Sequence, residues 1–208
     1  NLEEETGYIP ENSPTQIVGG EVLEKFEKHY HISRLLSQDK AQSYEELRDW
    51  IARANRLRDS YNQSTDDKLD KLEFIMEYKF DGLTINLTYD NGRLVSAATR
   101  GNGIVGEEIS AQVKTIKSIP LEIKEKSLLE IQGEALMPLS ELDRYNRENE
   151  LQLKNARNAA AGALRNLNPK ETARRRLTAY LYSIPTTSLD FKTEEEMLDF
   201  LKDLGFLV

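Results

Sequence analysis

Cysteine is absent from the 208 residues, and histidine occurs only twice. Without cysteine the chain can form neither a disulfide bond nor a thiolate metal site. The two histidines, His29 and His31, are close to each other in the sequence, and no further histidine or cysteine accompanies them. We therefore expect them to be structural or surface residues and not zinc ligands. No apolar run approaches the roughly 20 residues that span a bilayer, and no charged-then-apolar signal segment opens the chain. These absences favour a cytoplasmic protein.

The composition that remains is that of a globular protein, with 38% hydrophobic and 31% charged residues. It allows one substantial core but not two full domains. The net charge of −8 argues against indiscriminate binding of polyanions, although a net charge can conceal a local basic face. Residues 154–176 form such a stretch, with Glu171 as their single acid. Its basic members are Lys154, Arg157, Arg165, Lys170, Arg174, Arg175 and Arg176. The stretch is either a nucleic-acid-binding face or an ordinary solvated helix face.

Apolar periodicity and turn residues predict short strands and separate helices. We expect strands at residues 72–78, 84–90, 93–99, 128–136 and 177–184, and helices at about 43–61, 138–149, 155–167 and from 193 onward. The first and last of these helices each begin with a capping box, Ser43 with Glu46 and Thr193 with Glu196. Asn91 and Gly92 tolerate positive φ and predict the two-residue turn of a hairpin. Hairpins mixed with helices predict an α+β domain on an antiparallel sheet. Residues 1–20, with two prolines and a Gly-Gly pair, predict a connector arm before a domain at residues 21–208.

Candidate chemistry lies in residues 77–82, between a predicted strand and a hairpin. Alternation along a strand would put Glu77, Lys79 and Asp81 on one face, lining a cleft, while Tyr78 and Phe80 point into the core. A lysine amine attacks a phosphate only when deprotonated, and burial or a cationic neighbour lowers a lysine pKa. The Lys-x-Asp-Gly pattern is weak by itself, because it also describes a strand that ends at a turn.

Several further motifs follow in a fixed order, and together they resemble those of the bacterial NAD-dependent DNA ligases. The resemblance runs from about Ser13 to the end of the chain. Its motifs are Ser13-Pro14-Thr15-Gln16 with Val18-Gly19-Gly20, residues 77–82, Ala98-Thr99-Arg100-Gly101, and Asn158-Ala159-Ala160-Ala161-Gly162 with Leu164-Arg165. The family implies an antiparallel-sheet nucleotidyltransferase core, like that of DNA ligases and mRNA capping enzymes, with surrounding helices.

The resemblance also implies a role for each matching residue. Lys79 is expected to attack the α-phosphate of NAD, displace nicotinamide mononucleotide and become a lysyl-AMP phosphoramidate, which then activates nicked double-stranded DNA in replication and repair. Mg²⁺ is the implied metal, held largely by phosphates and water. The nucleotide-binding residues implied are Ser37, Glu77, Lys79, Arg100, Glu134 and Tyr182, with Tyr182 stacking on adenine. Arg157 and Arg165 are implied to bind the DNA backbone, and because their stretch is separate in sequence from the nucleotide motifs, we expect them to act on DNA and not on NAD.

Three positions depart from the family pattern. Gln38 stands where leucine is usual, Asn102 replaces an aspartate, and Ala156 stands where a proline commonly precedes Arg157. None removes a catalytic group, although Gln38 could alter the adenine pocket. The family also carries parts that do not match here: an N-terminal helical subdomain, two later nucleotidyltransferase motifs, and OB-fold, zinc, helix-hairpin-helix and BRCT parts. We therefore expect a fragment that is poorly active alone.

Two alternatives remain open. Lys-x-Asp-Gly also serves ATP-dependent ligases and RNA-capping guanylyltransferases, although the motifs at residues 13–20 and 158–165 count against them. The chain could instead be a catalytically silent nucleotide-binding or nucleic-acid-binding module. Retention of Lys79, Glu77, Arg100 and Glu134 together argues against that module.

Overall fold

The computed structural model describes residues 25–37, 39–150 and 152–208. The predicted arm at residues 1–20, the motif at residues 13–20 and the departure at Gln38 lie outside the described residues. The chain divides into two compact units. The main unit comprises Asn1–Leu35 and Lys79–Val208, and the helical unit comprises Leu36–Tyr78. Among the described helices, none combines the length and apolar character that crossing a membrane requires.

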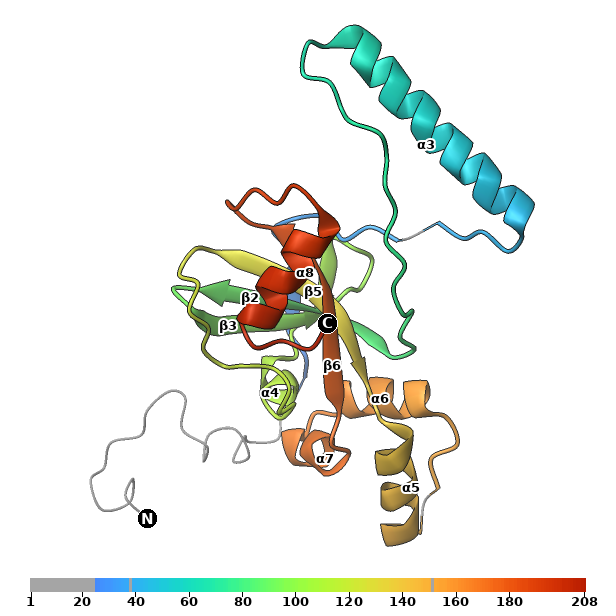
Figure 1. Ribbon diagram of the computed structural model, residues 1–208. Coiled ribbons are helices and arrows are strands. Elements are labelled where there is room, and N and C mark those ends of the chain that lie inside the picture. The colour runs from blue at the N-terminus through green and yellow to red at the C-terminus, as the bar shows by residue number, and fades with distance from the viewer. Residues whose placement is uncertain (1–24, 38, 151) are drawn as a thin grey trace. The chain divides into compact units, whose positions relative to one another are not determined.

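A four-stranded antiparallel sheet organises the main unit (Figure 1). Its order is β3 (Arg93–Thr99), β2 (Leu83–Asp90), β5 (Leu129–Leu136) and β6 (Thr178–Thr186). The predicted hairpin between β2 and β3 is confirmed, with φ of 51° at Asn91 and 78° at Gly92. A second sheet pairs β1 (Lys28–Tyr30) with β4 (Val105–Glu107). The expected antiparallel α+β architecture is therefore present.

In the described part of the main unit, five helices accompany the sheets. They are α4 (Ser110–Val113), α5 (Leu139–Glu148), α6 (Ala156–Leu164), α7 (Pro169–Arg174) and α8 (Glu194–Asp203). The predicted helix at residues 155–167 is shorter than expected. Asn168 caps a new helix there, and Pro169 occupies its first turn, where the missing N–H is tolerated. Asn155 and Thr193 cap α6 and α8 through hydrogen bonds to backbone amides three residues later.

The two faces of the main sheet have different characters, because side chains alternate along each strand. One face is apolar and fully buried, and it carries Ile85, Leu87, Ile131 and Leu181. These side chains belong to a core that also includes residues of α4, α6 and α8. The opposite face carries polar side chains from β2 and β5, so the folded sheet leaves one face available for chemistry.

The helical unit consists of α3 (Tyr44–Ser64) and an irregular segment. Ser43 caps α3 by accepting a hydrogen bond from the Glu46 amide, as predicted, and no residue of the helix is buried. The strand predicted at residues 72–78 is wrong, because this segment pairs with no other strand in the described structure. Tyr78, expected in the core, is 89% exposed. An alternating pattern alone therefore could not make a strand without a hydrogen-bonding partner.

Candidate active site

The polar face of the sheet begins with a row of side chains across three strands. Thr84 of β2 pairs with Glu134 of β5, which pairs with Tyr180 of β6. Thr84 Oγ1 donates a hydrogen bond of 3.0 Å to Glu134 Oε2. The Glu134 side chain is thereby oriented on a rigid strand, and it is largely buried.

Glu134 also fixes the segment that contains Lys79. The Gly82 amide donates to Glu134 Oε1 at 3.2 Å. A Cβ atom at Gly82 would lie 2.1 Å from the carbonyl oxygen of Ala135, which is closer than any real contact. Glycine at this position lets the chain approach β5 closely enough for the hydrogen bond to form. The glycine of the Lys-x-Asp-Gly pattern thus has a steric reason in this fold.

The residues before Gly82 are held by two further contacts. The Phe80 ring stacks on the Tyr180 ring, with centroids 4.1 Å apart and planes inclined by 17°. Asp81 Oδ1 forms an ion pair of 2.8 Å with Arg157 Nη1. The prediction that Phe80 points into the core is wrong, because the ring is half-buried against Tyr180 and lies outside the apolar core. Lys79 on one side of it and Asp81 on the other are exposed. The lysine amine is accessible to a substrate in solution.

The hydrogen bonds and positive charges around Glu134 oppose the effect of burial on the pKa of its carboxyl group. Burial raises the pKa of the Glu134 carboxyl group above its ordinary value. The hydrogen bonds from Thr84 and Gly82 act in the opposite direction, and so do the positive charges of Lys79 and Arg157. A buried carboxylate and two cations therefore share this end of the sheet.

Tyr182 lies within the same group of side chains. Burial raises the pKa of its hydroxyl to about 12, and the Glu134 charge adds to this effect. A hydrogen bond with Thr84, the charge of Arg100 and a hydrogen bond with Gln132 lower it. Thr84 and Gln132 were not predicted as site residues, although the alternation of polar residues along β2 was a signal for Thr84.

The structure brings together most of the predicted site residues of the main unit. Those that share its polar face or contact its edge are Lys79, Arg100, Glu134, Tyr182 and Arg157. Ser37 and Glu77 belong to the helical unit, where both are exposed. Because residues 72–78 form no strand, the expectation that Glu77 and Lys79 share a strand face is wrong.

The two arginines predicted to bind DNA have different surroundings. Arg157 pairs with Asp81, two residues after Lys79, so the expected separation from the nucleotide motifs is wrong for this residue. Arg157 and Asp81 are 76 residues apart in the sequence, and tertiary folding brings them together. Arg165 instead pairs with Glu107 at 3.5 Å, and both side chains are exposed.

Two of the departures from the family pattern have a local explanation. Asn102 Oδ1 accepts hydrogen bonds from the amides of Ile104 and Val105, at 3.0 and 2.9 Å. Asparagine can therefore supply the side-chain oxygen that closes this Gly-rich loop, as an aspartate would. Ala156 opens α6 without strain, because alanine has high helix propensity.

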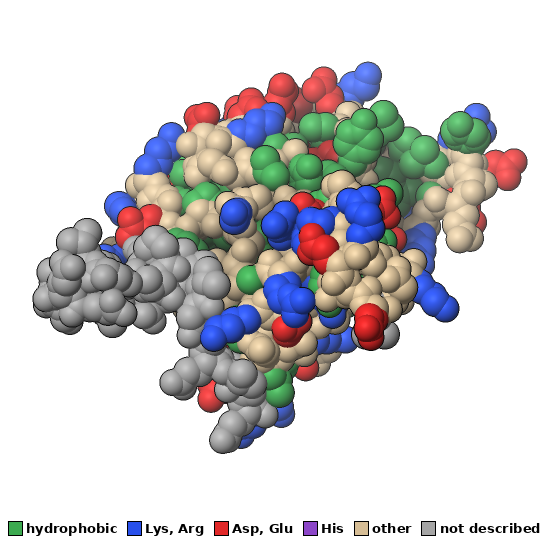
Figure 2. Space-filling model, turned by 90° about the horizontal axis from the view of Figure 1, so that it is seen from below, with side chains coloured by type: hydrophobic (Ala, Val, Ile, Leu, Met, Phe, Trp, Pro, Cys, Tyr) green, Lys and Arg blue, Asp and Glu red, His purple; other side chains and the backbone are tan. Residues whose placement is uncertain are grey.

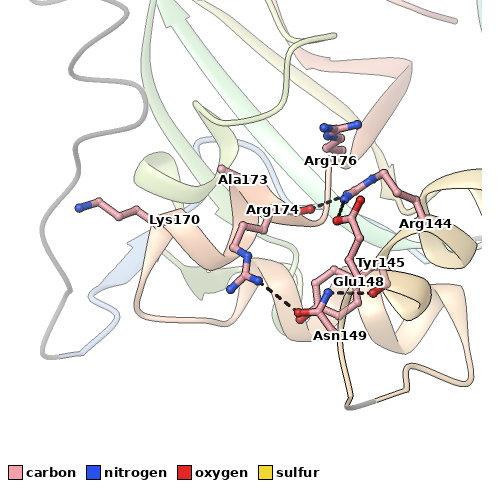
Figure 3. A pocket seen from close by; sticks show the side chains of 8 residues that line it. All are labelled: Arg144, Tyr145, Glu148, Asn149, Lys170, Ala173, Arg174 and Arg176. Atoms are coloured by element: carbon pink, nitrogen blue, oxygen red, sulfur yellow. Dashed lines mark hydrogen bonds and ion pairs between the residues drawn. The ribbon is translucent and has the colours of Figure 1, made fainter.

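The basic stretch is not a uniform positive surface. Figure 2 shows Lys and Arg side chains on the face seen from below, with acidic side chains among them. A hollow of about 450 Å³ lies between α5 and α7 and includes Arg144, Arg174 and Arg176 (Figure 3). Arg144 pairs with Glu148 at 2.5 Å and Arg174 with Glu171 at 3.2 Å. Exposed pairs of this kind contribute little stability, but they reduce the net charge that an anion would meet.

Comparison with known proteins shows which sequences this chain is similar to. The model of the family described as NAD-dependent DNA ligase adenylation domain matches residues 23–208. The chain is 56% identical to the DNA ligase of Finegoldia magna over 99% of its own length, and 51% identical to DNA ligase 2 of Clostridium acetobutylicum over 100%. It is 53% identical to the DNA ligase of Clostridium perfringens strain 13 over 99%. In each case it spans 31% of the relative.

A match over most of the chain, at identities above one half, leaves no room for a distant or accidental likeness. The Lys79 segment, the buried Glu134 and the surrounding cations are the parts that the family resemblance had marked. The chain therefore belongs to the family of NAD-dependent DNA ligase adenylation domains.

Proposed function

We propose that this chain forms part of a ligase and carries AMP from NAD to the 5′-phosphate of nicked DNA through Lys79. The observation that carries the proposal is the pair of hydrogen bonds that Glu134 accepts from the Gly82 amide and the Thr84 hydroxyl, which hold the segment with the exposed Lys79 at the edge of a polar sheet face. Residues 21–208 would then be a partial nucleotidyltransferase domain following an arm at residues 1–20. Action on DNA would place the protein in the cytoplasm.

The chemistry proceeds in three transfers at phosphorus. The deprotonated Lys79 amine attacks the α-phosphorus of NAD, a P–N bond forms, and nicotinamide mononucleotide leaves with the electrons of the broken P–O bond. The 5′-phosphate of the nick then attacks the same phosphorus, and the amine recovers its proton as the P–N bond breaks. Attack by the 3′-hydroxyl on the activated 5′-phosphate seals the strand and releases AMP. Such transfers depend mainly on positioning and charge neutralisation.

The surrounding side chains fit the positions that these transfers require. Tyr182 offers an aromatic face for adenine, while Arg100 and Glu134 are suited to the ribose and phosphate region. Glu77 would contact the adenine amino group, and Ser37 would be a neighbour of the nucleotide pocket. Arg157 and Arg165 would contact the DNA backbone near the nick.

Mg²⁺ would neutralise phosphate charge during the transfers. Among the described residues, neither Asp81 nor Glu134 belongs to a group of three or more side chains that could hold a metal ion together, so neither carboxylate is prepared as a dedicated metal ligand. This donor set fits an ion held mainly by substrate phosphates and water.

Intact-mass measurement tests the proposal directly. The longer protein that carries this chain is incubated with NAD and Mg²⁺, and we expect a mass increase of one adenylyl group that Lys79→Ala abolishes. Lys71→Ala, in the irregular segment of the helical unit, is the matched control and should retain the adduct. Parallel incubations with ATP and GTP test the other nucleotidyltransferases. Nucleotide binding without an adduct from any of the three would favour the silent module and overturn the proposal.

A further inference from the structure

The two histidines of the chain meet a buried glutamate in the folded main unit. His29 lies in β1 and His31 directly after it, so their side chains share a face, with ring centroids 5.3 Å apart. Glu130 of β5 is fully buried beside them. One ligand atom from each of these three residues lies within 4.8 Å of the other two. No sequence pattern connected Glu130 with the histidines, because about 100 residues separate them.

Each histidine is held by one ring nitrogen and directs the other toward the cluster. His31 Nε2 lies 3.1 Å from the Arg100 carbonyl oxygen, so Nε2 carries the proton and donates it. His29 Nδ1 lies 3.2 Å from a Glu108 carboxylate oxygen and 3.1 Å from the Ser96 hydroxyl. Because that hydroxyl donates to Glu108, we assign the proton of His29 to Nδ1. Metal-binding histidines are typically oriented in this way, with the second nitrogen donating to a carbonyl or a carboxylate. The nitrogens that remain, His29 Nε2 and His31 Nδ1, carry lone pairs.

Two buried polar atoms of this cluster lack partners. His29 Nε2 and Asn86 Oδ1 have no hydrogen-bond partner in the described part of the chain. A buried polar atom without a partner is costly, and it often marks the place of a water molecule or an ion. The histidine nitrogen is an electron-pair donor, which a cation in the cluster would satisfy, whereas Asn86 directs its Nδ2 toward the cluster and not its Oδ1.

Asn86 connects the remaining donors. Its Nδ2 lies 2.9 Å from Glu130 Oε1 and 3.3 Å from His31 Nδ1, so the amide group bridges these two acceptors. The other partners of Glu130 are the amides of Ile32 and Ser33 and the Thr186 hydroxyl. Rotation of the Asn86 amide by half a turn would remove its N–H groups from both acceptors and present Oδ1 in their place. The cluster would then offer two nitrogens and two oxygens.

We propose that His29 Nε2, His31 Nδ1 and Glu130 Oε1 bind one divalent transition-metal ion of the Zn²⁺ type, with Asn86 Oδ1 or water as the fourth ligand. Two imidazoles and a carboxylate are a common donor set for Zn²⁺, whereas Mg²⁺ and Ca²⁺ prefer oxygen ligands alone. The ion would connect β1 to β2 and β5 and would brace the Arg100 carbonyl through His31. The proposal departs from the expectation from the sequence, because folding brings Glu130 to the two histidines. The proposal is independent of nucleotidyl transfer.

Cobalt titration of the 208-residue chain tests the site, with circular dichroism used to verify folding. Co²⁺ in a site with imidazole and carboxylate ligands gives visible absorption, and we expect saturation at one ion per chain. His29→Ala and His31→Ala should each weaken binding by at least about a hundredfold, since each removes a ligand. Glu108→Gln, which alters only the partner of His29, should weaken binding by about 10-fold to 100-fold. Glu107→Gln, at the exposed neighbouring position, is the matched control and should bind as the unmodified chain does.

Zn²⁺ should also compete for the cobalt site and raise the melting temperature of the unmodified chain, because binding to the folded state alone stabilises it. This measurement decides the matter even where a histidine variant fails to fold. Absence of both the cobalt absorption and the shift in melting temperature in the folded chain would overturn the proposal. Unchanged binding by folded His29→Ala or His31→Ala would overturn it as well.

Discussion

Glu130 and Glu134 lie on the same face of β5, but their surroundings shift the pKa values of their carboxyl groups in opposite directions. Burial tends to raise the pKa of Glu130, but hydrogen bonds from Thr186, Ser33, Ile32 and Asn86 outweigh it, and the net shift is downward. Glu134 accepts two hydrogen bonds instead of four, and its net shift is upward. Glu130 is thus stabilised as an anion by its surroundings, whereas Glu134 is ionised at some cost to stability.

Replacement of Glu134 should therefore separate activity from stability. A group with a raised pKa in the folded state contributes stability below its unfolded pKa, near 4.5, and that contribution is lost as the pH rises through the folded pKa. At pH 7 Glu134→Gln removes the buried charge, so we expect a free energy of unfolding at least equal to that of the unmodified protein. Lys79 adenylation should fall by about a hundredfold to a thousandfold.

Urea unfolding between pH 3 and pH 8, together with the rate of adduct formation, measures both effects. Any stability advantage of Glu134→Gln should shrink as the pH falls through the raised pKa of the folded state, and it should be absent below about pH 4.5, where the carboxyl group is protonated in both states. Glu122→Gln, an exposed position, serves as the control for loss of one negative charge. If Glu134→Gln greatly lowered the free energy of unfolding at pH 7, the conclusion that the buried Glu134 charge destabilises the protein would be contradicted.

Arg157 and Arg165 should differ in the steps that they affect. Arg157→Ala removes the partner of Asp81, so the Lys79 segment loses one of its contacts and self-adenylation should slow by up to about a hundredfold. Arg165→Ala breaks only an exposed pair with Glu107, and self-adenylation should be unchanged. Each variant should also lower the slope of log affinity for nicked DNA against log salt by about 0.9. Equal adenylation rates in the two variants would show that the Asp81 contact does not position the lysine.

Among the structural elements, the loop between Lys79 and β2 has no room for a larger side chain at Gly82. Gly82→Ala places a Cβ atom 2.1 Å from the Ala135 carbonyl oxygen, so the loop must move away from β5. We expect a loss of about 1–3 kcal/mol in the free energy of unfolding and a loss of adenylation, because the hydrogen bond to Glu134 is broken.

Gly162→Ala in α6 is the matched control for this substitution. A Cβ atom there would meet only the flexible end of Arg175, at 3.3 Å, and Gly162 is an exposed helix residue. Alanine favours a helix over glycine, so we expect a gain of about 0.5–1 kcal/mol. Thermal or urea unfolding of the two variants distinguishes a steric effect at Gly82 from a general effect of replacing glycine. Equal changes in the two would rule out the close approach as the cause.

Helix and strand boundaries followed the sequence wherever local chemistry fixed them. Strand β5 and helix α5 lie within one residue of the predicted ranges at both ends. The N-caps Ser43 and Thr193 were also predicted correctly, because a capping residue acts on amides only a few positions away. The segment at residues 72–78 was not, since a strand also needs a partner that its own sequence cannot specify.

At the scale of the whole molecule, the main and helical units should differ in local stability. No side chain of α3 is buried, whereas most of β2 and β5 is. Local opening costs little free energy where few apolar contacts are lost. We therefore expect the amides of α3 to exchange with deuterium at least about tenfold faster than those of β2 and β5. Peptide-resolved exchange by mass spectrometry measures this difference, and comparable protection of α3 and β5 would contradict it.

The sequence by itself determined the features that depend on neighbouring residues: the hairpin at Asn91-Gly92, the helix caps and the motif around Lys79. Tertiary structure alone decided the burial of Glu134, the pairing of Asp81 with Arg157 and the meeting of the histidines with Glu130. The physical reason is range. Alternation and capping act over a few residues, whereas the environment of a charged side chain depends on strand register and on segments that lie many tens of residues away in the sequence.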